Sequence, residues 1–257
     1  TVNDGSSTPI VAPDPDGLPA LADIDPAITL GTLDNGLRYL IRRNDNPGAR
    51  VEMRLSIDAG SALQESDQGG GAHFLEHMLF NGTEQFPENE LIAVLRSFGA
   101  SFGADINAYT SYDETVYQLT MPTADPSTVS TGLDVLQQWL SAATIDQAQV
   151  EAERGVVLDE WRGSEASSDG RIFDGLEELF LAGSPYEAHD PIGNEAAINE
   201  ALTVIDGALA KMMQRELVST GEVADLLLEH EPGVADVLVE SGERAGLAEH
   251  LEAARRV

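Results

Sequence analysis

Residues 73–77 read His-Phe-Leu-Glu-His, and this short stretch decides how the rest of the chain is interpreted. On an α-helix, side chains four residues apart lie on one face with Cβ atoms about 5–6 Å apart, so His73 and His77 can both reach one metal ion. Glu76 lies beside the same patch, where it can take a proton from water without itself being a ligand. This arrangement is typical of a hydrolytic zinc site.

By itself, a histidine pair with this spacing is more often an accident of a helix surface than a metal site. Here the context favours a metal, because glycines precede the helix, a carboxylate lies between the histidines, and a second helix with carboxylates follows. The other three histidines have no such context and are interpreted as ordinary residues: His189, His230 and His250.

A catalytic zinc ion normally takes three protein ligands, so a third donor must come from elsewhere in the chain. The chain has no cysteine, which leaves imidazole and carboxylate as the strong ligands. A second predicted helix begins at an Asp146 cap and continues through residues 150–161. It places Glu153 and Glu160 on one stripe, about 10.5 Å apart along the axis. One of these carboxylates can therefore be a ligand and the other a supporting residue.

Together, the two motifs resemble the pitrilysin/insulinase family of zinc metallopeptidases, the inverzincins. The resemblance also covers several further stretches: Gly70-Gly71-Ala72, Asn81-Gly82-Thr83, residues 103–110 and Pro191-Ile192-Gly193. It implies that His73, His77 and Glu160 bind Zn2+, that Glu76 is the general base, and that Glu153 assists nearby.

The resemblance also implies how a peptide substrate binds. In this family an extended peptide adds as a strand beside the edge formed by residues 103–109, so its backbone is held independently of its sequence. Asn107 and Ala108 would then line the cleft. An ordinary sheet edge has the same sequence pattern, so for Asn107 both interpretations stay open.

The function implied is that of a zinc-dependent endopeptidase, which hydrolyses peptide bonds in unfolded or short peptides through a metal-activated water. The alternative is an inactive or incomplete zinc-binding half, acting as a subunit or interaction module that needs a partner domain. The presence of Glu76 favours the enzyme, because a structural subunit needs no base beside the metal. The length of 257 residues favours the alternative, because the family has a second homologous half.

The composition is strongly acidic, with 45 Asp and Glu against 14 Lys and Arg and a net charge of -31. This charge repels nucleic acid and anionic membrane surfaces, so neither is an expected partner, and no apolar stretch is long enough to span a bilayer. Such acidity is usually associated with solubility or with high salt. Attraction of cationic peptides is the functional alternative.

Three regions are expected along the chain. Residues 1–28 are predicted to be a flexible leader rich in Pro and Asp, which suits an extracytoplasmic protein of the periplasm or cell envelope, and equally a trimmed chain. Residues 29–200 are the predicted metallopeptidase domain. Residues 201–257 are predicted to form an atypical tail of short helices without a strand, because Pro232-Gly233 and Gly242 interrupt the pattern.

Within residues 29–200, strands are predicted at residues 37–43, at residues 50–59 and in two runs between residues 101 and 121. Helices are predicted at the motif, at residues 87–98 and from Asp125-Pro126 to about residue 140. The motif helix is expected to end in a left-handed cap at Asn81-Gly82. This order predicts an α+β fold, a layered antiparallel or mixed sheet with helices packed on it.

Overall fold

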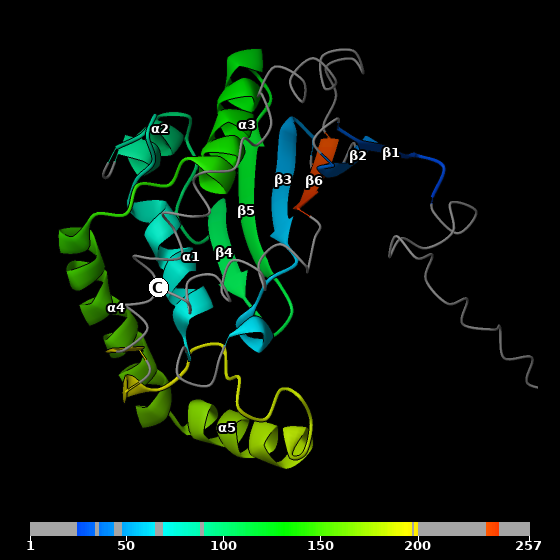
Figure 1. The fold of residues 1–257 in the computed structure, drawn as a ribbon. Helices are drawn as coiled ribbons and strands as arrows, with labels where there is room; N and C mark the ends of the chain where they lie inside the picture. Colours follow the sequence, from blue (N-terminus) through cyan, green and yellow to red (C-terminus); the bar gives the residue numbers. More distant parts are fainter. Residues whose placement is uncertain are drawn as a thin grey trace, which may run out of the picture.

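The computed structural model describes residues 25–33, 36–43, 48–64, 69–87, 90–196, 198–199 and 235–241. Within this part of the chain, a six-stranded sheet carries helices packed against it (Figure 1). The predicted α+β class, a mixed sheet with helices on it, is confirmed.

The strands of the sheet follow the order β1-β2-β6-β3-β5-β4. All neighbours pair antiparallel except β3 and β6, which run parallel. The strand bounds are β1 Ile28–Thr32, β2 Arg38–Arg43, β3 Arg50–Ile57, β4 Ile106–Thr110, β5 Thr115–Pro122 and β6 Ala235–Ser241. In this sheet β4 forms one edge and β1 forms the other.

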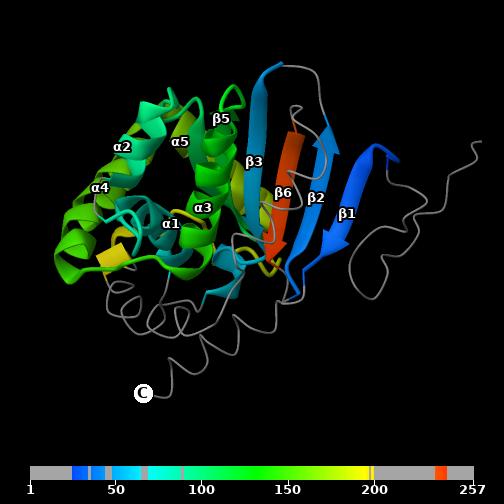
Figure 2. The same cartoon turned by 90° about the horizontal axis from the view of Figure 1, so that it is seen from above.

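Besides the sheet, the described structure has five α-helices and a 3-10 turn, and residues 195–196 and 198–199 are also helical. Their bounds are η2 Ser61–Leu63, α1 Gly71–Asn81, α2 Glu90–Ser97, α3 Pro126–Ser141, α4 Gln147–Ala166 and α5 Ser168–Leu181. Seen from above in Figure 2, the helices gather on one side, while β2 and β1 extend away from them. Helix α3 packs on β5 and β3, and α1 packs on β4 and β5.

Two helices begin at an aspartate cap, which was predicted as such at Asp146, while Asp125-Pro126 was predicted only as a helix start. Asp125 accepts a hydrogen bond from the Ser127 N–H at 2.9 Å before α3, and Asp146 accepts one from the Ala148 N–H at 2.8 Å before α4. Each bond satisfies a backbone donor that has no partner inside the helix. The cap of α4 fixes where this helix begins, and so which of its residues face α1.

The main core lies between the sheet and helices α2 and α3. Alternate residues of β3 and β5 point into it, as expected for strands with one covered face. Its fully buried members include Met53, Leu55, Leu91, Leu95, Leu119, Met121 and Val135. This core packs β4 and β5 beneath α1.

The C-terminal region contributes a strand to the sheet. Residues 235–241 form β6, which lies between β2 and β3, with Leu238 opposite Leu40 and Arg54. The prediction of helices without a strand is therefore wrong for these residues. Val237 and Val239 favour a strand, but pairing with two strands far away in the sequence decides the outcome. The remaining residues of the predicted tail lie outside the described part.

Two boundaries also differ in detail from the predictions. Gly82 has φ 166° and ψ 157°, which is extended backbone, so the left-handed cap predicted for α1 is wrong. The chain continues directly into a bridge between Thr83 and Ala143, and this pairing requires an extended residue at the helix end. Residues 25–28, the last of the predicted leader, form a turn and begin β1, while residues 1–24 lie outside the described part.

Candidate metal centre

Helix α1 carries the first motif, and its N-terminus is fixed by side-chain and backbone contacts. The buried Gln64 side chain accepts a hydrogen bond from the Ala72 N–H at 2.6 Å, which satisfies one of the free donors of the first turn. Gly70, the N-cap, has φ 83°, and a Cβ atom there would lie 2.6 Å from the Ile192 carbonyl oxygen. Only glycine tolerates both conditions, which explains the glycines before the motif.

The loop at residues 190–193 supports the same helix end. Gly193 has φ 73°, and a Cβ atom there would lie 2.5 Å from the Gly69 backbone. The Ile192 N–H donates to Asp190 Oδ1 at 3.1 Å, which holds the turn. Burial, together with the nearby carboxylates of α4 and α5, raises the pKa of Asp190 to about 6. The Pro191-Ile192-Gly193 stretch thus contributes to the site by positioning α1.

A small apolar cluster clamps α1 against α4. It consists of Phe74 and Met78 from α1, Val150 and Val157 from α4, and Ile198. Phe74 directly follows His73, and Met78 directly follows His77. Burying these two apolar side chains therefore turns the histidines toward α4. Val157 likewise fixes the face of α4 that carries Glu153 and Glu160.

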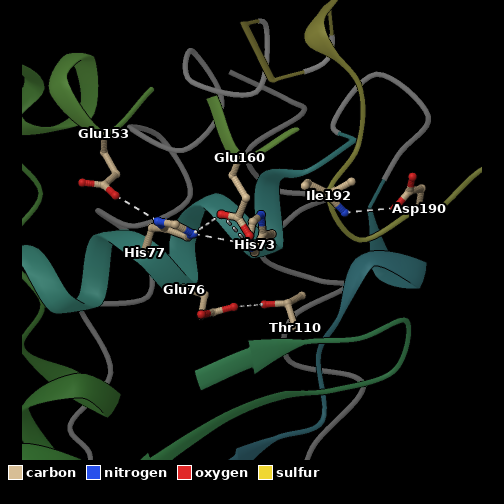
Figure 3. A network of polar contacts seen from close by, with 8 residues as sticks. All are labelled: His73, Glu76, His77, Thr110, Glu153, Glu160, Asp190 and Ile192. Carbon is tan, nitrogen blue, oxygen red and sulfur yellow. Dashed lines mark hydrogen bonds and ion pairs between the residues drawn. The ribbon is translucent and has the colours of Figure 1, made fainter. Parts of the chain in front are cut away.

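Three side-chain atoms converge between the two helices (Figure 3). Nε2 of His77 lies 3.3 Å from Nε2 of His73 and 3.3 Å from Oε2 of Glu160, and Nε2 of His73 lies 3.9 Å from the same oxygen. All three ligand atoms fall within 4.8 Å of one another. Two imidazoles and one carboxylate, converging on a common point, fit the donor set of catalytic zinc.

Glu153 lies in a second layer behind the histidines. Its Oε1 is 2.9 Å from His77 Nδ1, and the Asn81 amide donates to its Oε2 at 2.9 Å. This contact holds the imidazole with Nε2 facing Glu160, as carboxylates behind metal-binding histidines commonly do. Nδ1 of His73 is buried and has no hydrogen-bond partner within the described residues, so packing rather than a second-layer carboxylate orients that ring.

Glu76 is directed toward the sheet rather than toward α4. Its side chain is buried, with 7% exposed, and its Oε2 accepts a hydrogen bond from the Thr110 hydroxyl of β4 at 2.8 Å (Figure 3). Burial raises the pKa of Glu76, although the Thr110 hydrogen bond and the neighbouring His77 act in the opposite direction. Glu76 is thus a poorly solvated carboxylate beside the converging ligands, outside the group of three.

The charges of the two histidines differ in the metal-free protein. Burial lowers the pKa of His73 to about 4, and the neighbouring His77 adds to this effect. Burial also opposes a charge on His77, but its contacts with Glu153 and Glu160 outweigh burial and raise its pKa to about 9. The contact with His77 lowers the pKa of both glutamates. Without metal, His77 is therefore the protonated histidine of the pair and His73 the neutral one.

The open edge of β4 passes beside this centre. At its turn with β5, the Ser111 N–H donates to the Glu114 carbonyl at 2.8 Å. Because bonded and non-bonded pairs alternate along an antiparallel ladder, the backbone N–H and C=O groups of Ala108 and Thr110 face away from β5. These groups point to the open side of the strand.

The rest of this edge is already occupied. The loop before β4 donates from the Gly103 N–H to the Ile106 carbonyl at 2.8 Å and accepts from the Ile106 N–H at 3.2 Å. The exposed Asn107 side chain accepts a hydrogen bond from the Ala108 N–H at 3.0 Å. Among the described residues, the Ala108 carbonyl and the Thr110 N–H and C=O groups are therefore what remains for an added strand.

Reasoning from the sequence proposed the three converging residues, Glu76 and Glu153, and the structure brings them together. The sequence did not point to Thr110 or Asn81 as site residues. Asn81 was detectable, since it lies four residues after His77 on the same helix face. His189 lies apart from the group of three, whereas His230 and His250 lie outside the described residues.

Comparison with known proteins identifies the same region. The family model described as Insulinase (Peptidase family M16) matches residues 39–189. The chain is 39% identical over 191 residues to the probable zinc protease PqqL of Escherichia coli K12, covering 74% of this chain and 20% of that protein. It therefore spans about a fifth of the length of this relative.

Solved structures agree with this match. The periplasmic protease PqqL from Escherichia coli superposes with a TM-score of 0.66 at 31% identity, covering 90% of this chain and 24% of that one. The crystallised first half of the same protease gives a TM-score of 0.64 at 32% identity, covering 88% of this chain and 45% of that one. This chain belongs to the insulinase family of zinc peptidases, peptidase family M16.

Proposed function

We propose that this chain is the metal-bearing catalytic domain of a zinc-dependent endopeptidase. The observation that carries this proposal is the convergence of His73, His77 and Glu160 within 4.8 Å, with the buried Glu76 carboxylate beside them. Membership of a peptidase family supports it. Of the two glutamates on α4, Glu160 is assigned as the ligand, because it lies beside Nε2 of His77, whereas Glu153 contacts Nδ1.

Zinc held by these three residues would polarise the scissile carbonyl and acidify the attacking water. Glu76 takes the proton from that water and passes it to the departing amine nitrogen. The base is carried on the helix turn that supplies two ligands, so its distance from the reacting atoms is set by backbone geometry. Glu153 keeps His77 in the orientation that presents Nε2.

Peptide substrates bind, in this proposal, as an added strand along β4. The outward-facing N–H and C=O groups of Ala108 and Thr110 offer a short ladder, which recognises backbone rather than side chains. Asn107 and Ala108 are then the substrate contacts, and the Asn107 amide must release the Ala108 N–H when the peptide pairs. A ladder of this kind selects extended chains, so unfolded or short peptides are the expected substrates.

A second function is supported by one surface feature. Helix α5 buries none of its residues, and it exposes an apolar stripe of side chains, 44–75% accessible, at helical spacing: Ile172, Phe173, Leu176, Leu179 and Phe180. A contiguous apolar surface of this kind commonly marks an interface. The chain could therefore act as a zinc-binding half that is active only with a homologous second half or partner subunit.

The proposed location is extracytoplasmic, supported by the similarity to a periplasmic protease. No helix within the described residues is long and apolar enough to cross a membrane. The net charge of -31 argues against nucleic acid as a partner.

One experiment tests the proposed function and its alternative together. The zinc-loaded chain is incubated with a quenched fluorescent peptide while its mass is measured, with and without a candidate partner chain, and a chelator-treated sample is the control. Chelator-sensitive cleavage by the monomer supports the enzyme and contradicts the need for a partner. Cleavage only in a heavier complex that is lost in Phe180→Asp supports the second function. No cleavage in any sample contradicts both.

A further inference from the structure

We propose that Thr110 is a positioning residue for Glu76, and that it links the bound peptide to the base. This inference rests on the proposed function and adds a residue to it. Thr110 Oγ1 donates to Glu76 Oε2 at 2.8 Å, across the interface between β4 and α1. The motif helix alone therefore does not fix the catalytic carboxylate, because the sheet holds one of its oxygens.

The hydroxyl comes from the hydrogen-bonded end of the β4–β5 hairpin. Thr110 pairs with Thr115 as the last residue of the β4–β5 ladder, and the next pair, Ser111 and Glu114, closes the turn with a 2.8 Å hydrogen bond. The Thr115 hydroxyl in turn donates to the buried Ala59 carbonyl at 2.8 Å. A donor anchored in this way can hold the carboxylate in one rotamer.

This hydrogen bond leaves the two oxygens of Glu76 unequal. Because Oε2 accepts from Thr110, Oε1 is the oxygen assigned to proton transfer. Without the hydroxyl, the carboxylate can rotate about its terminal side-chain bond, whose torsional preferences are broad. A base displaced by about 1 Å can lose about 100-fold in rate, while the ligands and the peptide-binding edge stay intact.

Thr110 also contributes backbone groups to the open edge where the peptide is proposed to pair. The same residue therefore contacts the substrate backbone through its main chain and the base through its side chain. Pairing with the peptide then sets the distance between the scissile bond and Glu76. This arrangement requires that the side-chain hydroxyl acts on kcat and that the backbone acts on KM.

If the Thr110 hydroxyl were only structural, its removal would have a different effect. In that case the hydrogen bond only satisfies a buried carboxylate, and its loss lowers stability without a specific effect on turnover.

Thr110→Val removes the donor at nearly constant shape and keeps a β-branched side chain. Thr110→Ser keeps the donor, and Thr110→Ala is a second variant without it. Thr131→Val removes a hydroxyl that donates to the Ser127 carbonyl on α3, a helix that carries none of the site residues, and serves as the matched control.

The experiment uses the zinc-loaded full chain and, where a partner is required, the complex. For each variant we measure kcat and KM on the quenched peptide, the zinc content, and the melting temperature in the Glu76 and Glu76→Ala backgrounds. The expected result for Thr110→Val and Thr110→Ala is a kcat lowered by roughly 10- to 100-fold, with KM within about twofold and zinc unchanged. Thr110→Ser is expected to recover most of kcat, and Thr131→Val to match the parent.

The melting temperatures give a readout that does not depend on turnover. Thr110→Val is expected to lower the melting temperature more when Glu76 is present than in Glu76→Ala, because the hydrogen bond exists only in the first background. Equal shifts in both backgrounds, an unchanged kcat, or a Thr110→Ser variant as slow as Thr110→Val would overturn the inference. A parent protein that does not cleave would overturn the proposed function itself, and with it the reaction that Thr110 serves.

Discussion

Oε1 of Glu153 lies 2.9 Å from Nδ1 of His77, and this contact determines which ring nitrogen is turned toward the other ligands. With Nδ1 engaged, Nε2 lies 3.3 Å from both His73 and Glu160. The two glutamates of α4 therefore have different roles, although they share one helix stripe. Glu160 lies beside Nε2 of His77, and Glu153 lies beside Nδ1.

The first prediction concerns Glu153. Replacing it with Ala removes the contact that orients His77 and leaves the Asn81 amide without its carboxylate partner. Zinc affinity is expected to fall by about 10- to 100-fold, as for other residues behind metal ligands. Competition with a fluorescent chelator measures it. Asp159→Asn, an exposed change on the same helix, should leave the affinity unaltered, and equal effects of the two changes would contradict the role of Glu153.

The second prediction separates ligand from support. Glu160→Ala removes one of the three converging donors, so zinc affinity is expected to fall further than in Glu153→Ala. Titration of both variants under the same conditions gives the order directly. If Glu153→Ala proved to be the more damaging change, the two assignments would have to be exchanged.

The third prediction concerns the pH dependence of the metal-free protein. The pKa of His77 is raised to about 9, so its stabilising contacts are fully present below its ordinary pKa of 6.5 and are lost as pH rises toward 9. The pKa of His73 is lowered to about 4, so folding is increasingly opposed as pH falls from 6.5 to 4. The contribution of these two histidines to stability without metal is therefore expected to peak near pH 6.5, while the raised pKa of Asp190 opposes the His73 effect between pH 4 and 6.

Thermal unfolding in excess chelator between pH 4 and pH 9.5 measures this profile. In His77→Gln the decline above pH 6.5 should become shallower, because the residue responsible for it no longer titrates. Parallel declines in the parent and the variant would show that another group causes the loss. Zinc affinity in the parent is expected to increase with pH over the same interval, since the metal must displace the His77 proton.

The fourth prediction concerns the glycines that hold the start of α1. Gly193→Ala places a Cβ atom 2.5 Å from the Gly69 backbone at a residue with φ 73°. We expect it to lower the free energy of unfolding by at least about 1–3 kcal/mol. Gly155→Ala on α4, where a Cβ atom meets nothing within 4 Å, should instead stabilise the helix by about 0.5–1 kcal/mol. Denaturant titration compares them, and a harmless Gly193→Ala would remove the proposed support of α1.

The sequence predicted those parts of the site that depend on local spacing. His73, Glu76 and His77 follow from helix periodicity, and the resemblance to a known family added Glu160. The role of Thr110 could not be predicted in this way, since it depends on β4 packing beneath α1, a contact between residues 34 positions apart. A hydroxyl in a strand has no periodic signature that shows its partner.

The fold shows the same limit. The strands and helices between residues 37 and 141 were predicted because each has its own turn, cap or alternation signal. Strand β6 was missed because its position between β2 and β3 is set by pairing with strands far away in the sequence. The end of α1 at Gly82 was predicted incorrectly because the bridge from Thr83 to Ala143 requires extended backbone there.

Glu76→Gln tests the central claim most directly, because it removes the base and leaves all three converging ligands in place. Zinc content and peptide cleavage are measured on the same preparation beside the parent. We predict one zinc ion per chain in both proteins and a turnover lowered by about 100- to 10,000-fold in the variant. A variant that cleaves at the parent rate, or a parent that binds no zinc on titration, would contradict the account.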